Sequence, residues 1–292
     1  MPAATGSSLH WWGTLLYVPV LYGLGWLIAR PLALLFPFWR PDQVDLAGVV
    51  VSLLLLLLTL PWRLRRTWGV AQPWQCLGVT SSPSAGLRAF GGGLLKATAL
   101  LLGVVVVLLV SGQSQWQGQL TGGQALNAIA LLLGVGFAEE LLFRGWLWGE
   151  LELQGGPQRA MVLQAICFAL VHPWYQLPPL EAITLLPGLV LLGLALGLQR
   201  RADAGVLWGC IGLHGGLVGG WFALQSGLIS IPAANPVWLL NTANPIGGLV
   251  GWIGLGSVLA LLRQTVKGRQ QADQRTAVAK AARPDTGARS AS

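Results

Sequence analysis

Long apolar runs, separated by short polar breaks, recur along almost the whole chain. A helix needs about 20 predominantly apolar residues to cross the hydrocarbon core of a bilayer. The runs that approach or exceed this length are 11–29, 43–62, 87–110, 124–148, 160–174, 182–199, 204–226 and 245–262. The pattern predicts an all-α fold, a polytopic transmembrane bundle of about eight helices.

The character of the chain changes after residue 262. Residues 263–292 hold seven Lys and Arg against two acids and have few large apolar side chains. Such a segment buries too little surface to fold alone, so we expect a basic, disordered cytoplasmic tail, with attraction to anionic lipid as its functional alternative. The predicted organisation is a membrane-embedded helical domain over 1–262, with its chemistry at about 125–225, followed by this tail.

Composition agrees with the apolar pattern. Apolar residues make up 54% of the chain and charged residues only 10%, which is far from the usage of soluble domains. The net charge of +8 is carried largely by the tail and by loops next to the membrane, so it indicates no nucleic-acid partner. We therefore expect an integral, multi-pass membrane protein whose surroundings are lipid.

The basic residues also predict an orientation. If the N-terminus is cytoplasmic, the outside loops contain only Arg30 and Arg40, whereas the inside loops contain Arg63, Arg65, Arg66, Arg88, Arg159, Arg200 and Arg201. Lys and Arg are enriched in cytoplasmic loops. Both termini are therefore predicted to be cytoplasmic.

Ionisable groups inside a bilayer are costly, so each one is a candidate for function. The fourth run contains Glu139, Glu140 and Arg144 within two helical turns. Glu140 and Arg144 are i, i+4 neighbours that can pair on one helix face. Glu139 is rotated by about 100° from Glu140, which makes it the freer carboxylate and the better candidate for a general base.

Two histidines, His172 and His214, lie in the fifth and seventh runs. Counted from the cytoplasmic helix ends, Glu139, His214 and His172 lie at depths of roughly 14, 15 and 18 Å. A lone intramembrane His is often a structural hydrogen-bonding group, and a Glu–Arg pair is often a buried ion pair. Their combination at matched depth favours one functional site on neighbouring helices.

These residues resemble the motifs of the CPBP family, the CAAX-prenyl-endopeptidase and bacteriocin-processing (Abi) group of intramembrane proteases. The family pattern Glu-Glu-x-x-x-Arg matches Glu139, Glu140 and Arg144, and its Phe-x-x-x-His matches Phe168 and His172. The third motif, a His followed four residues later by Asn or a similar polar residue, matches His214 only in part, because position 218 is Val. The resemblance covers roughly residues 125–225.

The resemblance implies an intramembrane endopeptidase in which Glu139 activates a water molecule, while His172 and His214 hold that water or stabilise the oxyanion. Val218 weakens the case for that stabilisation. The implied substrate is a membrane-associated peptide or protein, with a prenylated C-a-a-X tail, a bacteriocin leader and a membrane-anchored regulator all compatible.

The sequence does not decide whether the site uses a metal cofactor. Two His and one Glu, here Glu139, His172 and His214, suit a divalent metal such as zinc, although the H-E-x-x-H motif is absent. Activation of water by Glu and His without a metal is equally consistent.

Three other interpretations compete with the peptidase. A proton-coupled transporter would use the buried Glu and His as a relay, but the chain shows no internal repeat of broken helices. A non-catalytic membrane scaffold of the same fold would account for Val218. Cys210 and His214, four residues apart, would form a thiolate–imidazole pair, although a membrane-buried thiol is more often packing.

Overall fold

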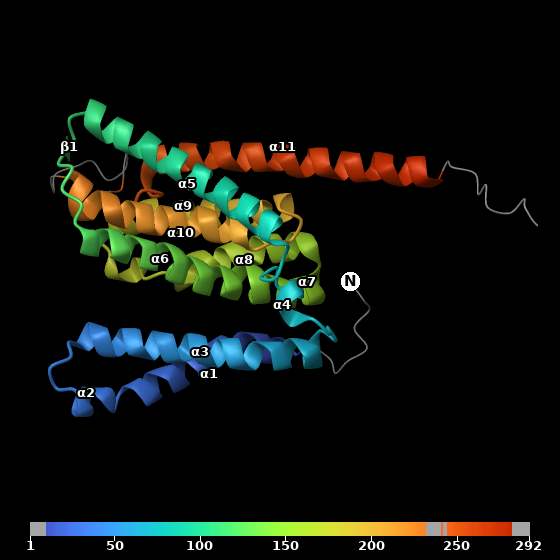
Figure 1. The fold of residues 1–292 in the computed structure, drawn as a ribbon, viewed down its shortest axis with the longest axis horizontal. Helices are drawn as coiled ribbons and strands as arrows, with labels where there is room; N and C mark the ends of the chain where they lie inside the picture. Colours follow the sequence, from blue (N-terminus) through green and yellow to red (C-terminus); the bar gives the residue numbers. More distant parts are fainter. Residues whose placement is uncertain (1–9, 232–240, 242–243, 282–292) are drawn as a thin grey trace, which may run out of the picture.

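The computed structural model describes residues 10–231, 241 and 244–281 of the chain (Figure 1). Within these residues all eight predicted helices are present, and the predicted all-α class is confirmed. They are α1 (Trp11–Ala29), α3 (Pro41–Thr67), α5 (Pro83–Val110), α6 (Gly122–Glu140), α8 (Pro157–Val171), α9 (Pro179–Ala202), α10 (Trp208–Ala223) and α11 (Gly248–Ala281).

Short elements connect or extend these helices. The helical ones are α2 (Leu32–Leu35), α4 (Pro73–Cys76), α7 (Trp148–Gly155), the π-helices η1 (Leu141–Leu147) and η3 (Leu224–Leu228), and the 3₁₀-helix η2 (Trp174–Gln176). Two strands, β1 (Gln115–Trp116) and β2 (Ile229–Ser230), pair antiparallel with Gln115 opposite Ser230 and Trp116 opposite Ile229. This short ladder joins the loop after α5 to the end of η3.

Six helical segments among the described residues are long and apolar enough to cross a membrane. They are Trp11–Leu35, Pro41–Thr67, Pro83–Val110, Gly122–Gly155, Pro179–Ala202 and Gly248–Ala277. The other two predicted spans are shorter, because α8 has 15 residues and α10 has 16, or about 24 Å at 1.5 Å per residue. The protein is a multi-pass integral membrane protein, and the cytoplasmic orientation of its termini stays a prediction.

Helix α10 lies in the middle of the bundle, between α5 and α6 (Figure 1). Its glycines allow this position. A Cβ atom at Gly212 would overlap the Phe90 carbonyl oxygen of α5, and one at Gly215 would overlap the Leu132 carbonyl oxygen of α6. Small residues thus bring three backbones together, as they do between membrane helices generally, and they place His214 at the centre.

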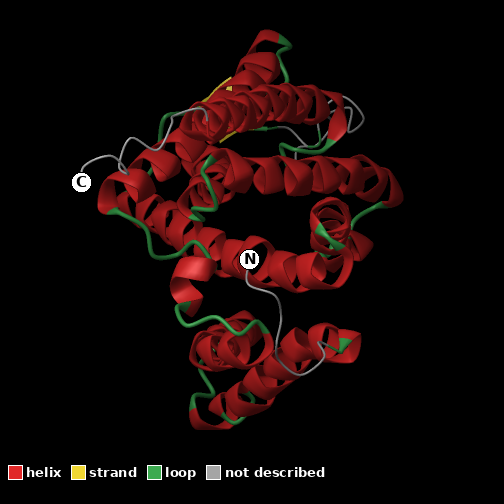
Figure 2. Cartoon of the chain, turned by 90° about the vertical axis from the view of Figure 1, so that its right-hand side faces the viewer, coloured by secondary structure: helices red, strands yellow, loops and turns green. Residues whose placement is uncertain are grey.

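Helices α1 and α3 form an N-terminal hairpin beside the remaining helices (Figure 2). The buried carboxylate of Glu150, on α7, links this hairpin to the rest. It accepts hydrogen bonds from the Arg63 guanidinium at 3.0 and 2.9 Å and from Thr14 Oγ1 at 2.7 Å. The indole nitrogens of Trp68 and Trp146 donate to it at 3.1 and 3.0 Å. The buried Glu150 carboxylate is therefore neutralised by Arg63 of the hairpin and also accepts a hydrogen bond from Trp146 of η1, so it connects the hairpin with the other helices.

Glu150→Gln tests this link, because it keeps the side-chain volume and removes the charge that its five donor contacts require. We expect the free energy of unfolding to fall by about 2 kcal/mol, the scale of losing hydrogen bonds to a charged group. Glu152→Gln, two residues along the same helix, is the matched control, since Glu152 accepts one bond from Trp148 Nε1 at 3.1 Å. Denaturant titration with limited proteolysis of the 68–82 segment measures both, and equal losses would show that Glu150 has no special linking role.

The tail departs from its predicted disorder. Helix α11 runs without a break through residue 262 to Ala281, so the expectation is corrected for residues 263–281, while 282–292 lie outside the described residues. Extending an existing helix needs no new nucleus, and the Arg, Lys, Gln and Ala residues of this segment are strong helix formers. The segment therefore takes its structure from the preceding span without a core of its own.

Candidate active site

Three side chains from three different segments converge on one point. The Glu139 Oε2 atom, near the end of α6, lies 3.8 Å from His172 Nε2 and 3.9 Å from His214 Nε2. His172 directly follows α8, and His214 is in the middle of α10. The structure thus brings together the three residues whose matched depths suggested a shared site.

The second ring nitrogen of each histidine is already bonded. His172 Nδ1 lies 2.6 Å from the Phe168 carbonyl oxygen, and His214 Nδ1 lies 2.8 Å from Glu140 Oε1. A carbonyl and a carboxylate oxygen only accept, so both Nδ1 atoms carry the proton. In the neutral rings, the Nε2 atoms therefore present lone pairs toward Glu139.

Glu140 and Arg144 form the predicted ion pair, with Arg144 Nη1 2.8 Å from Glu140 Oε1 and neither side chain exposed. The same carboxylate oxygen receives the His214 Nδ1 proton. The guanidinium carbon of Arg144 lies 4.2 Å from the centre of the Phe168 ring, a cation–π distance. Glu140 and Arg144 therefore hold His214 and Phe168, whereas Glu139 is left to face the two Nε2 atoms.

The local backbone differs from the predicted spans at two places. The predicted span 160–174 ends as a helix at Val171, and His172 is extended, with φ −70° and ψ 148°. Pro173 is the cause, because a residue before proline is pushed out of the helical region. The fourth span contains the π-helix η1 between α6 and α7, a form that is frequent at functional sites and that no residue spacing had indicated.

Glu139, His172 and His214 line a cavity of about 280 Å³. Val218 is also in its wall, so the position that is polar in the family motif contributes only methyl groups. Two polar residues that the sequence analysis missed, Trp221 and Asn244, line the same cavity. The remaining lining is apolar and comes from α6, α9, α10 and the turn before α11.

Metal binding and thiol chemistry were the open alternatives. Among the described residues, no group of three or more His, Cys, Asp and Glu side chains is arranged to hold a metal ion, so the side chains of this site do not fit a bound metal. The Cys210 thiol donates to the Leu196 carbonyl oxygen at 3.2 Å and is fully buried. Cys210 is also not among the residues that line the Glu139 cavity, so we interpret it as a packing residue.

Two family models match the chain. Residues 121–219 match the Type II CAAX prenyl endopeptidase Rce1-like family, and residues 2–72 match a domain of unknown function, DUF8676. No curated protein and no solved structure matches the chain. The first match contains all five predicted site residues and confirms the resemblance drawn from their motifs; the second contains the N-terminal hairpin that Glu150 holds.

Proposed function

We propose that this chain, whose residues 121–219 match the Rce1-like type II CAAX prenyl endopeptidase family, hydrolyses a peptide bond with a water molecule activated by Glu139. The family match supports an intramembrane endopeptidase in general terms. The observation that carries the finer proposal is the convergence of Glu139 Oε2 with two histidine Nε2 atoms at 3.8 and 3.9 Å.

These distances are too long for direct hydrogen bonds and suit a substrate water held between the three atoms. All three present lone pairs, so such a water donates its hydrogens to two of them and directs its oxygen toward the cavity. Glu139 Oε2 is buried, and no other described residue bonds to it. Its lone pairs are therefore available to accept the water proton.

The reaction then follows in two proton transfers. The water oxygen bonds to the carbonyl carbon of the scissile peptide as its proton passes to Glu139, which gives a tetrahedral oxyanion. Collapse of this species re-forms the carbonyl and breaks the C–N bond, while Glu139 returns the proton to the leaving nitrogen. Glu140 and Arg144 take no part in these transfers; they keep His214 in its Nδ1–H tautomer and orientation.

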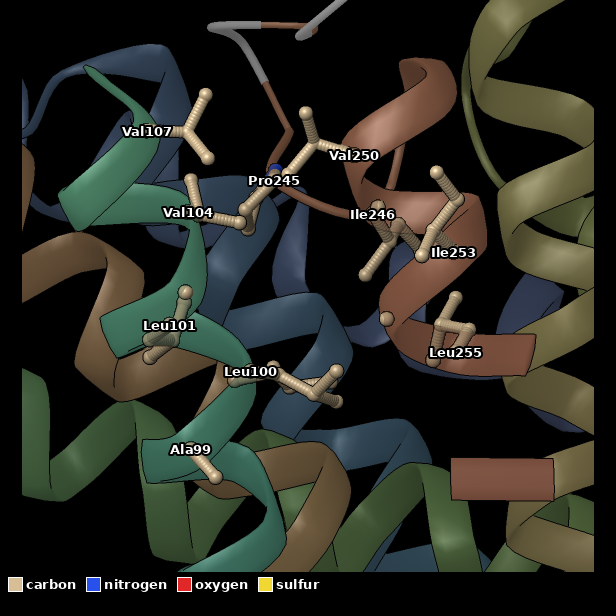
Figure 3. Close-up of a pocket in the computed structure, with 14 residues that line it drawn as sticks. Ala99, Leu100, Leu101, Val104, Val107, Pro245, Ile246, Val250, Ile253 and Leu255 are labelled. Carbon is tan, nitrogen blue, oxygen red and sulfur yellow. The ribbon is translucent and has the colours of Figure 1, made fainter. Parts of the chain in front are cut away.

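A second cavity supports a membrane-associated substrate. It has a volume of about 250 Å³, lies between α5 and α11, and all its lining residues are apolar (Figure 3). Leu217, Pro245 and Ile246 belong to its wall and also to the wall of the Glu139 cavity. An apolar chain bound there, such as a lipid modification next to the scissile bond, would lie beside the proposed water, so we include prenylated peptides among the proposed substrates.

The proposal is tested with full-length protein in lipid nanodiscs and peptides that carry or lack a C-terminal prenylated cysteine. Mass spectrometry of the products should show one internal cleavage, with the prenylated peptide preferred. His172→Ala and His214→Ala should abolish cleavage, whereas His10→Ala, a histidine outside the cavity, should keep it. Chelator and zinc additions in the same assay address the metal alternative.

The competing interpretations predict other outcomes. A non-catalytic scaffold would cleave none of the membrane peptides. A proton-coupled transporter would leave them intact while Glu139 and His172 control proton uptake into liposomes. Cleavage that persists in both cavity-histidine variants would overturn the proposed site.

A further inference from the structure

The proposed reaction needs hydrogen-bond donors that Glu139, the two histidines and Val218 do not supply. As the peptide carbonyl becomes an oxyanion, it requires N–H or O–H groups pointed at it. Glu139 and the two Nε2 atoms are acceptors in the tautomers set by their partners, and Val218 has no polar group. The cavity must contain its donors elsewhere.

Trp221 is the first such donor. Its side chain is 6% exposed and lines the cavity, and among the described residues its indole nitrogen has no hydrogen-bond partner. A buried N–H without a partner is destabilising and is rare in native proteins. Trp221 follows His214 by seven residues on α10, nearly two complete turns, so both side chains lie on one helix face.

Asn244 is the second donor. Its Oδ1 atom accepts from the Ile246 backbone N–H at 3.3 Å, in the turn that leads into α11. This bond distinguishes the two ends of the carboxamide, because the end that faces Ile246 must be the oxygen. The Nδ2 group, with its two hydrogens, is left for the cavity that Asn244 lines.

We propose that Trp221 Nε1–H and Asn244 Nδ2–H bind the carbonyl oxygen of the scissile peptide and stabilise the oxyanion formed from it. The pair supplies, from α10 and from the turn before α11, the polar function that is absent at Val218. The inference rests on the proposed peptidase function and adds two catalytic residues to it.

Two substitutions remove the donors with little change in shape. Trp221→Phe keeps an aromatic ring without the N–H, and Asn244→Asp keeps the oxygen that accepts from Ile246 without the NH₂ group. Each should lower kcat by roughly 100-fold, as the loss of one oxyanion donor does, with KM changing by less than about 3-fold because the bond strengthens in the transition state. Trp252→Phe is the matched control, since its N–H donates to the Thr184 carbonyl oxygen outside the cavity; its kcat should be unchanged.

Val218→Asn provides a rescue. Placed in the Trp221→Phe protein, it returns a donor to the same cavity wall and should recover at least about 10-fold of the lost kcat, part of the loss expected for one oxyanion donor. A purely structural role for Trp221 would not respond to this change. Normal kcat in both donor variants, in protein where Glu139→Gln is inactive, would overturn the donor pair alone; an active Glu139→Gln would overturn the proposed function itself.

A binding measurement tests the proposal even if Trp221→Phe or Asn244→Asp folds poorly. In Glu139→Gln protein labelled with ¹⁵N-tryptophan, the Trp221 indole signal is identified by its loss in Trp221→Phe. Addition of uncleaved substrate peptide should shift this signal downfield as the N–H gains an acceptor. An unmoved signal at saturating peptide would contradict the proposal.

Discussion

Glu139→Gln should reduce peptide cleavage by roughly 100-fold or more, the scale of general-base catalysis, while the protein stays folded. Glutamine keeps the length and one oxygen acceptor of the side chain but cannot take a proton from water. The environment tolerates the change, since the Glu139 side chain is 31% exposed and its contacts to the histidines are 3.8 and 3.9 Å long. Single-turnover cleavage in nanodiscs, normalised to folded protein, measures the loss.

The matched control is Glu181→Gln on α9, a carboxylate outside the Glu139 cavity, which should cleave at the normal rate. Combining Glu139→Gln with His172→Ala should add little further loss, because groups that act on one water are not additive. A Glu139→Gln protein with normal turnover would remove Glu139 from the mechanism. Multiplying losses in the double variant would mean that His172 acts in a separate step.

The positions of the helices could be predicted from the sequence because the membrane imposes a simple rule. A bilayer demands long apolar runs, and those runs coincide with α1, α3, α5, α6, α8, α9, α10 and α11. The grouping of Glu139, His172 and His214 followed from the same rule, since parallel spans convert residue number into depth. The pairing of Glu140 with Arg144 needed only helical periodicity.

What the sequence could not provide depends on contacts between distant segments. Asn244 follows His214 by 30 residues and lines the same cavity because the turn before α11 packs against α9, where a Cβ atom at Gly188 would overlap the Ile246 carbonyl oxygen. No sequence motif distinguished Trp221, because the burial of its N–H without a partner among the described residues appears only in the structure. No sequence motif indicated the role of Glu150, because its partners Arg63 and Thr14 come from the N-terminal hairpin, far away in the sequence.

Two predicted helix boundaries, the end of α8 and the end of α11, differ from the structure for local reasons. Pro173 ends α8 at Val171, one residue before His172, and a proline at that position was a readable signal. Disorder was predicted for the tail because it has too few apolar residues to build a core. A helix that continues an existing span needs no core of its own.

Arg144→Ala should give the largest loss of stability, about 3–5 kcal/mol in the free energy of unfolding, the usual result of leaving a buried carboxylate without its partner. Glu140 and Arg144 are both 0% exposed, and the pair is 2.8 Å long. The variant also loses the guanidinium that lies 4.2 Å from the Phe168 ring. Poor accumulation of folded protein and a lower Tm are expected, whereas Arg159→Ala at an exposed position should change neither.

A second variant separates the ion pair from the geometry that it supports. Glu140→Gln combined with Arg144→Met removes both charges together, so no unpaired charge stays buried and most of the lost stability should return. The side-chain amide introduced by Glu140→Gln keeps an oxygen that accepts the His214 Nδ1 proton, so the ring that faces Glu139 retains its tautomer. If this double variant is as unstable as Arg144→Ala, the cost lies in lost packing against Phe168. If Arg144→Ala itself melts normally, water reaches Glu140, and the buried pair is not what holds His214 in place.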